Sequence, residues 1–319
     1  MVTSVRLAEL RLDPQAIGRV LYRRGLPCDV CVLTGRNPLV LKFKIEKRRM
    51  QFQLTVSTDS LLREPAESRL FELYHENTKL SMQTAAQYFK ASSTPSSIER
   101  YLTTRGFRQF HAGEQIALPA ATQSPESLQD VMLRRRSGRQ LSGPVELCEL
   151  ATLLNQSLGC TAIVEDDETE IVHALRAWPS AGGLYPLDTY VIVGNVTGVP
   201  AGVYHYNPIT SSLESKPSRP PDKVLSDAFF GQAFAINASV SVFLVASFDR
   251  TVAKYGERGY RLVLLDAGHA AQNLLLTAEQ MFLDAVAMGG YCDDSLASDL
   301  GIDGVSEAVV HSVLMGRST

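Results

Sequence analysis

The chain has 319 residues, 45% of them hydrophobic and 20% charged, and a formal net charge of -3, a globular composition that suits one large domain or two smaller ones. A charge so close to neutral gives no reason to expect nucleic acid or an anionic membrane as a partner, and we find neither an apolar run of the roughly 18 residues that span a bilayer nor the apolar core of a secretory signal. Five cysteines, an odd number in a chain that can build a large core, argue against a disulfide framework and predict a cytoplasmic protein.

The first elements of the chain are short. Residues 13–25 predict a helix between an Asp-Pro start and a glycine stop. Residues 38–45 and 50–57 alternate apolar and polar side chains, which is typical of a β-hairpin. Cys28 and Cys31 form a CxxC pair, but no second ligand pair follows at zinc spacing, so we interpret them as ordinary cysteines.

Residues 1–118 as a whole have the outline of a winged-helix-like docking domain. Residues 81–90 and 94–107 predict two short helices, and residues 108–118 predict a two-stranded wing with a glycine in its turn. Residues 79–118 carry five basic and two acidic side chains, a surplus of three positive charges over forty residues, which is a weak phosphate footprint. We therefore favour a peptide-docking or structural module over a DNA-binding one.

A linker is expected at residues 119–127, which are small, polar and proline-containing, and a second domain at residues 128–319. Strands and helices interleave in this domain, which predicts an α/β or α+β class. Helices are expected at residues 127–141, running into a basic turn, at 144–159 and at 258–284, and strands at 187–196, 202–215 and 240–248. Residues 306–316 fit a helix or a strand, residues 161–178 are acidic and irregular, and the charged residues 250–257 predict a loop.

The basic turn, Arg134 to Arg139 with the sequence RRRSGR, is the first candidate site. Several guanidinium groups and a hydroxyl within six residues suit a phosphate, because the arginine fork matches phosphate oxygens. A solvated basic helix end explains the same pattern. No GxGxxG or Walker A motif accompanies it, so the usual sequence evidence for a dinucleotide or a nucleoside triphosphate is lacking.

Two glycine-containing stretches are further candidates. Residues 179–186 read PSAGGLYP, in which prolines stiffen both ends and glycines let a ligand approach the backbone. Residues 288–291 read MGGY, where adjacent glycines allow backbone N–H groups to meet a ligand edge. Plain tight turns explain both stretches equally well.

Seven stretches between residues 128 and 317 read, in chain order, RRRSGRQL, PSAGGLYPLDTYVIV, AGVYHYNP, AKYGERGYR, LLDAGHAAQNLLLTAE, MGGYCDD and VLMGR. In this order they resemble the SagB-type branch of the flavin-dependent nitroreductase superfamily. The resemblance implies an α+β nitroreductase-like fold, with a central antiparallel-rich sheet flanked by helices, and a homodimer with FMN at the subunit interface. Similar enzymes of the microcin B17 synthetase type oxidise thiazoline and oxazoline rings to thiazoles and oxazoles in ribosomally made peptides, which implies a role in antibiotic biosynthesis.

The resemblance also implies which residues hold FMN. The implied phosphate contacts are Arg135, Ser137, Arg139 and Arg317. The residues implied around the isoalloxazine ring are Pro179, Ser180, Gly182, Gly289 and Gly290. Two positions differ from the wider superfamily: Gly289 stands where many nitroreductases have a glutamate, and Asp266 replaces the glutamate often seen before GHxxQN on an expected interface helix.

Lys254 and Tyr255 are the implied catalytic pair, because KYGERGYR aligns without a gap with the Lys-Tyr motif of the peptide-azoline dehydrogenases. The flavin takes a hydride, so the protein must supply a base. Burial lowers the pKa of a lysine and a neighbouring cation lowers the pKa of a tyrosine, which poises such a pair for proton transfer near neutral pH. Which of the two removes the proton stays open, and a solvated lysine beside a packed tyrosine is the alternative.

Other polar residues have less definite roles. His269, Gln272 and Asn273 share one helical face, which fits flavin, substrate or a subunit interface. His205 lies on an expected strand, where alternation separates it from its neighbours' side chains, and we interpret it as structural.

The sequence thus predicts an FMN-dependent azoline dehydrogenase whose N-terminal region docks the precursor peptide or a cyclodehydratase partner. One alternative is a SagB-type flavin oxidoreductase that acts on a carrier-bound or free small molecule. Another is a flavin-free scaffold subunit of a biosynthetic complex, but the arginines and glycines retained at the implied flavin positions argue against it.

Overall fold

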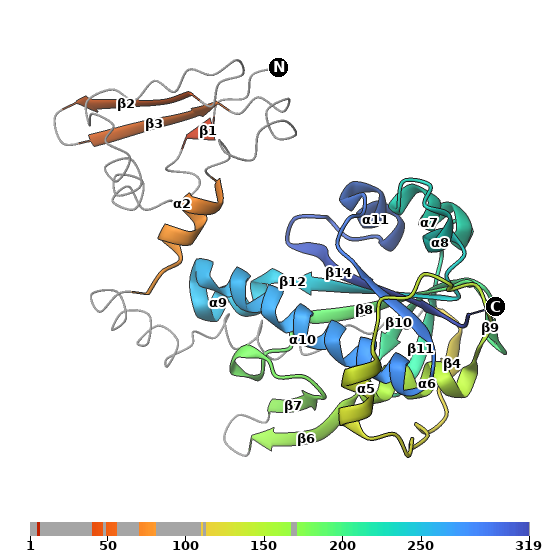
Figure 1. Ribbon diagram of the computed structural model, residues 1–319. Helices are drawn as coiled ribbons and strands as arrows, with labels where there is room; N and C mark the ends of the chain where they lie inside the picture. Colours follow the sequence, from red (N-terminus) through yellow and green to blue (C-terminus); the bar gives the residue numbers. More distant parts are fainter. Residues whose placement is uncertain are drawn as a thin grey trace. The chain divides into compact units, whose positions relative to one another are not determined.

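The computed structural model describes residues 5–6, 40–46, 49–55, 70–80, 110, 113–166 and 171–318 (Figure 1). Contacts between residues divide the chain into two compact units, Met1–Gln87 and Tyr88–Thr319. In the first unit the strands β1 (Val5–Arg6), β3 (Arg49–Thr55) and β2 (Val40–Glu46) form a sheet in that order, and the unit also contains the helix α2 (Leu70–Asn77). β2 and β3 pair antiparallel with Phe43 opposite Phe52, so the predicted hairpin is confirmed.

Most of the expected winged-helix-like domain lies outside the described residues. Outside them also lie the predicted helices at 13–25, 81–90 and 94–107 and the CxxC pair of Cys28 and Cys31. Part of the predicted wing is described: β4 (Gln115–Ala117) pairs antiparallel with β11 (Ser212–Lys216) of the second unit. Ile116 packs against the core there and Leu118 is buried, so this strand belongs to the large sheet. Most of the other strand of the predicted wing, residues 108–112, lies outside the described residues. The linker at residues 119–127 stays a prediction.

Seven antiparallel strands form the centre of the second unit, in the order β13-β14-β12-β8-β10-β11-β4. The further strands are β8 (Leu187–Val193), β10 (Gly202–Asn207), β12 (Val240–Ser247), β13 (Asp284–Met288) and β14 (Glu307–Gly316). β8 is buried along its whole length and β12 along all but its last residue, as expected for central strands covered on both faces. β14 pairs with β12 on one side and β13 on the other, so residues 306–316 form a strand and not a helix.

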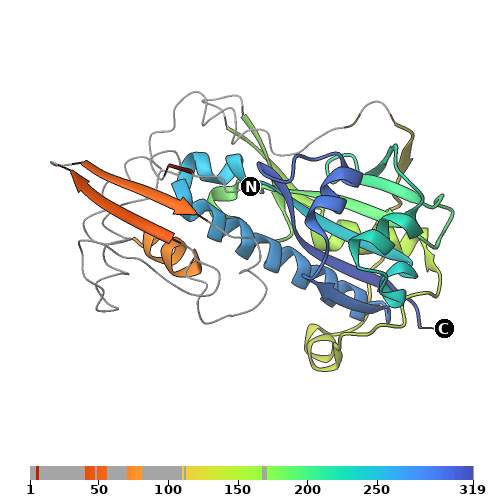
Figure 2. The ribbon, with the colours of Figure 1, turned by 90° about the horizontal axis from the view of Figure 1, so that it is seen from above.

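Helices cover both faces of this sheet (Figures 1 and 2). They are α6 (Leu147–Leu158) and α10 (Gly259–Gln280) on one face, and α7 (Pro221–Ala228), α8 (Ala233–Ile236) and α11 (Asp293–Leu300) on the other. Because successive strand residues point to opposite faces, Val191 and Val193 of β8 belong to the core beneath α6 and α10, whereas Tyr190 and Ile192 belong to the other core. The predicted α+β fold, an antiparallel sheet flanked by helices, is confirmed.

The prediction for residues 161–178 is wrong. They contain a hairpin of β6 (Cys160–Asp166) and β7 (Ile171–Arg176). Ile163 and Val164 of this hairpin are 57% and 47% exposed, so neighbouring positions on both faces remain open to solvent. At exposed positions such as these, no alternation of apolar and polar residues is needed, and the sequence there carries no such signal.

Shorter elements complete the second unit. The helix expected before the basic turn is α5 (Leu128–Arg134), whose first turn Ser127 caps by accepting the N–H of Asp130 at 3.2 Å. β5 (Val145–Glu146) pairs in parallel with β9 (Val196–Thr197). Over the described ranges, none of the helices combines the length and apolar character needed to traverse a bilayer.

Candidate functional site

Two motifs that lie far apart in the sequence meet at Gly182. Gly182 has a left-handed φ of 64° in the short turn Ala181–Gly183. A Cβ atom placed on this glycine would lie 2.5 Å from the hydroxyl oxygen of Tyr255 and 3.0 Å from Nζ of Lys254. The fold therefore brings the predicted catalytic pair against the predicted ring-binding loop, and glycine alone suits both the conformation and the close contact.

Lys254 and Tyr255 form the last turn of a helix, α9 (Phe248–Tyr255), where a loop was expected. A helix of eight residues is marginal alone, and packing against α10 supports this one. At Gly259, the first residue of α10, a Cβ atom would lie 2.9 Å from Cα of Val252, so the two helices approach closely. Both catalytic candidates are half-buried, and Nζ of Lys254 lies 5.5 Å from the centre of the Tyr255 ring, within cation–π range.

Asp266 of α10 holds the start of the loop that contains Gly182. The Ser180 hydroxyl donates a hydrogen bond to the Asp266 carboxylate, and the Ser180 oxygen accepts the backbone N–H of Tyr185 at 2.9 Å. Burial raises the pKa of Asp266, although the hydrogen bonds from Ser180 and from the backbone of Ala181 oppose the shift. Asp266 is thus a structural anchor of the loop, and Pro179, exposed beside it, leads into the turn.

The raised pKa of Asp266 predicts a pH-dependent stability difference. Because the folded pKa exceeds the unfolded value of 3.8, the folded state binds the proton more tightly, and wild-type stability falls as the pH rises through these two values. The asparagine of Asp266→Asn does not ionise, so this variant does not lose stability in this way. The Tm of Asp266→Asn minus the Tm of wild type should therefore increase as the pH is raised from 3.8 to neutrality. Thermal melts across this range measure the difference. Asp222→Asn, at a carboxylate with 60% of its side chain exposed, is the control, and an equal trend in both variants would contradict the assignment.

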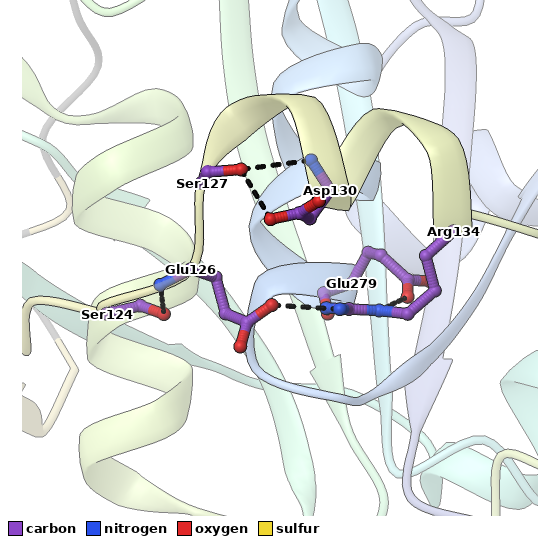
Figure 3. A network of polar contacts seen from close by, with 6 residues as sticks. All are labelled: Ser124, Glu126, Ser127, Asp130, Arg134 and Glu279. Atoms are coloured by element: carbon purple, nitrogen blue, oxygen red, sulfur yellow. Dashed lines mark hydrogen bonds and ion pairs between the residues drawn. The ribbon is translucent and has the colours of Figure 1, made fainter.

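The first arginine of the basic turn has a structural role (Figure 3). The Arg134 guanidinium pairs with Glu126 at 2.8 Å and with Glu279 at 2.6 Å, and also donates to the backbone carbonyl of Glu279. Glu279 lies in the last turn of α10. Arg134 therefore ties α5 to the end of α10 and is engaged before any phosphate binds.

Arg135, Ser137 and Arg139 follow this anchor. Ser137 forms a parallel bridge with Ala285 of β13, and the N–H of Gly138 donates to the carbonyl of Ala285 at 3.1 Å. Within the described part of the chain, no ion pair engages Arg135 or Arg139, and the Arg139 guanidinium lies 5.6 Å from the centre of the Phe234 ring. The segment thus keeps two cations and a hydroxyl available for an anion.

The Gly289-Gly290 pair directly follows β13, the strand that starts beside Ser137. Both glycines are exposed, and a Cβ atom on either would meet no atom within 4 Å. Ala285 and Gly289 are four residues apart, about 13 Å along a strand. The basic segment therefore lies beside the start of β13, and the exposed backbone of Gly289 and Gly290 follows its end.

Arg317 differs from Arg135 and Arg139 because its guanidinium is already paired. Its backbone pairs with Gly143, and its guanidinium donates to the Glu149 carboxylate at 2.5 Å. Arg317 would have to exchange or share this partner to contact a phosphate. Its assignment stays a prediction.

Some residues are tied into the structure. His205 is buried, and its Nδ1 lies 2.9 Å from the Glu214 carboxylate, which agrees with a structural role. The Asn273 amide donates to the carbonyls of Ser157 and Ala177.

Sequence reasoning did not single out Arg250, which is buried beside the Gly182 loop. A cation three residues after the end of the apolar β12 is the one signal that points to it.

Comparison with known proteins adds independent findings. Residues 133–317 match the model of the nitroreductase family. MJ1384 of Methanocaldococcus jannaschii, which has a provisional nitroreductase name, is 36% identical over 176 residues, or 55% of this chain and 84% of that protein. The microcin B17-processing protein McbC of Escherichia coli is 29% identical over 133 residues, or 40% of this chain and 49% of McbC. A solved structure from Anabaena variabilis, also provisionally named a nitroreductase, shares a TM-score of 0.60 and 26% identity over 76% of this chain and 45% of that one. The chain thus spans about half the length of McbC and of the Anabaena variabilis protein.

Proposed function

Because this chain belongs to the nitroreductase family, we propose that it is an FMN-dependent dehydrogenase that oxidises azoline rings of a ribosomally made peptide to azoles. The observation that supports this most directly is the contact of Gly182 with Lys254 and Tyr255. It joins two groups capable of proton transfer to a loop suited to a flat ring. The similarity to McbC, a microcin-processing protein, supports a peptide substrate.

The reaction requires two C–H bonds of the azoline to break. A proton leaves the α-carbon, a hydride leaves the β-carbon, and a double bond forms between the two carbons. When bound, FMN supplies the hydride acceptor, and dioxygen is the oxidant that finally takes both electrons. Lys254 or Tyr255 accepts the proton, since both groups lie against Gly182.

The residues present fit FMN. Arg135, Ser137 and Arg139 offer a phosphate two guanidinium groups and a hydroxyl, while the open backbone at Gly289 and Gly290 offers N–H donors to a ring edge. The strand that links the two sets covers about 13 Å, a span comparable to the distance from the phosphate of an extended FMN molecule to the far edge of its ring. These residues would hold the cofactor by its two ends.

Removal of one phosphate contact should weaken FMN binding. Arg139→Ala is expected to raise the dissociation constant of FMN about 10- to 100-fold, the equivalent of one charge-assisted hydrogen bond of about 1.5–3 kcal/mol. Fluorescence titration of the apoprotein with FMN measures the effect. Arg136→Ala is the matched control, because its guanidinium is exposed and donates to the backbone carbonyls of Leu133 and Arg135. Equal FMN affinity in Arg139→Ala and wild type would remove Arg139 from the phosphate site.

A second copy of the chain would complete the site. Asp266, which anchors the Gly182 loop, and Glu279, which anchors Arg134, are 13 residues apart on α10, or about 20 Å. Leu264 and Leu265 between the two ends of this helix are 41% and 59% exposed, an apolar surface that a partner would cover. We therefore include a homodimer in the proposal, and sedimentation at the mass of a single chain would contradict it.

The partners follow from the proposed substrate. An azoline arises by cyclodehydration of a cysteine, serine or threonine in a peptide, so a cyclodehydratase must act before this enzyme. The N-terminal region is proposed to dock the precursor peptide or that partner enzyme.

The decisive experiment is mass spectrometry of a synthetic azoline peptide after incubation with the protein, FMN and dioxygen. A loss of two hydrogens per ring is expected. A yellow protein that leaves the peptide unchanged but turns over a small-molecule or carrier-bound substrate would favour the alternative oxidoreductase. A colourless protein that FMN cannot reconstitute would exclude both.

A further inference from the structure

Arg250 is a buried cation on the helix that carries the catalytic pair. It precedes Lys254 by four residues in α9, so the two side chains share one face of the helix. Arg250 is 7% exposed. Its Nη1 lies 3.4 Å from the carbonyl oxygen of Tyr185, and its Nη2 lies 3.4 Å from the carboxylate of Asp188. Burying a guanidinium is costly unless partners compensate it, and here the partners are the end of the Gly182 loop and the start of β8.

The backbone that Arg250 contacts is strained. Tyr185 has a φ of 44°, a conformation that costs a residue with a Cβ atom on the order of 1–3 kcal/mol and persists only where its neighbours enforce it. Three neighbours do so. The Ser180 oxygen accepts the Tyr185 N–H, the Trp178 ring packs edge-on at 5.6 Å between centroids, and Arg250 binds the carbonyl.

Two buried charges thus hold the two ends of one loop. Asp266 of α10 binds Ser180 at its beginning, and Arg250 of α9 binds Tyr185 at its end. Gly182, between these anchors, contacts Lys254. Because Arg250 and Lys254 stand one turn apart on α9, the arginine links the loop directly to the helix turn that presents the amine.

We propose that Arg250 is a positioning residue, which ties α9 to the end of the loop and so fixes the Lys254 amine against Gly182. The inference rests on the proposed function for its effect on turnover. The position of the amine itself is measurable without any substrate.

The test compares Arg250→Gln and Arg250→Lys with wild type in the purified holoenzyme. Acetic anhydride labels lysine amines, and mass spectrometry gives the rate at Lys254 relative to Lys223, whose side chain is 70% exposed. Loss of the tether should raise this ratio severalfold in Arg250→Gln. Arg250→Lys keeps a charge beside Asp188 but has one nitrogen in place of the fork, so an intermediate ratio is expected. With an azoline peptide, Arg250→Gln should lower kcat by about 100-fold, the scale of a 1 Å misplacement, with a smaller change in KM.

The outcomes separate the two proposals. Arg219→Gln, at an exposed arginine paired with Asp227 and Asp299, should leave both readouts at wild-type values. If Arg250→Gln does not fold, the labelling ratio of Arg250→Lys decides. Folded variants with a wild-type ratio at Lys254 would overturn the positioning role, as would a loss of Tm and FMN with unchanged labelling. A raised ratio in a protein that oxidises no azoline would instead support the positioning role and refute the substrate.

Discussion

Lys254→Ala and Tyr255→Phe should each lower the rate of azoline oxidation by about 10²- to 10⁴-fold, the usual contribution of a general base, while FMN stays bound. The structure gives the reason for both parts of this expectation. The Tyr255 hydroxyl and the Lys254 amine converge on Gly182, whereas the proposed phosphate contacts lie on the segment that runs beside β13. Peptide mass spectrometry measures turnover, and the flavin absorbance of the purified variants measures occupancy.

Matched controls make this result specific. Lys223→Ala removes an amine with 70% of its side chain exposed, and Tyr260→Phe removes the hydroxyl of a tyrosine stacked on Phe248; both should remain active. Loss of flavin in the Lys254 or Tyr255 variant, or full activity, would refute the catalytic assignment. The double variant shows whether the two groups act as one unit, because effects of coupled groups do not add.

Gly182→Ala should disable the site through a single methyl group. The added carbon would meet the Tyr255 hydroxyl at 2.5 Å and Nζ of Lys254 at 3.0 Å, so the proposed catalytic pair must move. A displacement on this scale is expected to lower turnover by about 100-fold. The left-handed φ adds strain of about 1–2 kcal/mol, which thermal unfolding measures.

Gly183→Ala is the control that introduces the backbone strain without the collision. Gly183 has a φ of 66°, almost equal to that of Gly182, but a Cβ atom there meets nothing within 4 Å. Both variants should lose stability through backbone strain, Gly182→Ala more because of the collision, and Gly182→Ala alone should lose most of its activity. Equal turnover in the two variants would show that the contact with Lys254 and Tyr255 is not catalytic.

The sequence predicted best those elements whose environment leaves a regular pattern. β12 is buried along nearly all of its length, and a near-continuous apolar run predicted it. The hairpin of β2 and β3 alternates apolar and polar residues and was also predicted correctly. The sequence suggested two possibilities for β14, because short apolar runs fit a helix or a strand, and pairing with β12 and β13 settled the choice.

The two errors in the second unit have a common cause. α9 is short and charged, and it is helical where α10 packs closely against it at Gly259. The β6–β7 hairpin exposes neighbouring apolar residues, Ile163 and Val164, so it lacks a periodic pattern. Neither element therefore leaves an extended periodic pattern that a local window of sequence could detect.

The sequence by itself determined the residue types of the site and their order along the chain: a basic turn, a proline-bounded glycine loop, a Lys-Tyr pair and a second glycine pair. Only the tertiary structure decided which of them meet. It placed Gly182 under Lys254 and Tyr255, left Arg135 and Arg139 available while Arg134 serves α5 and α10, and buried Arg250 at the end of the loop. The physical reason is that chemistry depends on contacts a few ångströms long, and these arise where helices and strands remote in sequence pack together.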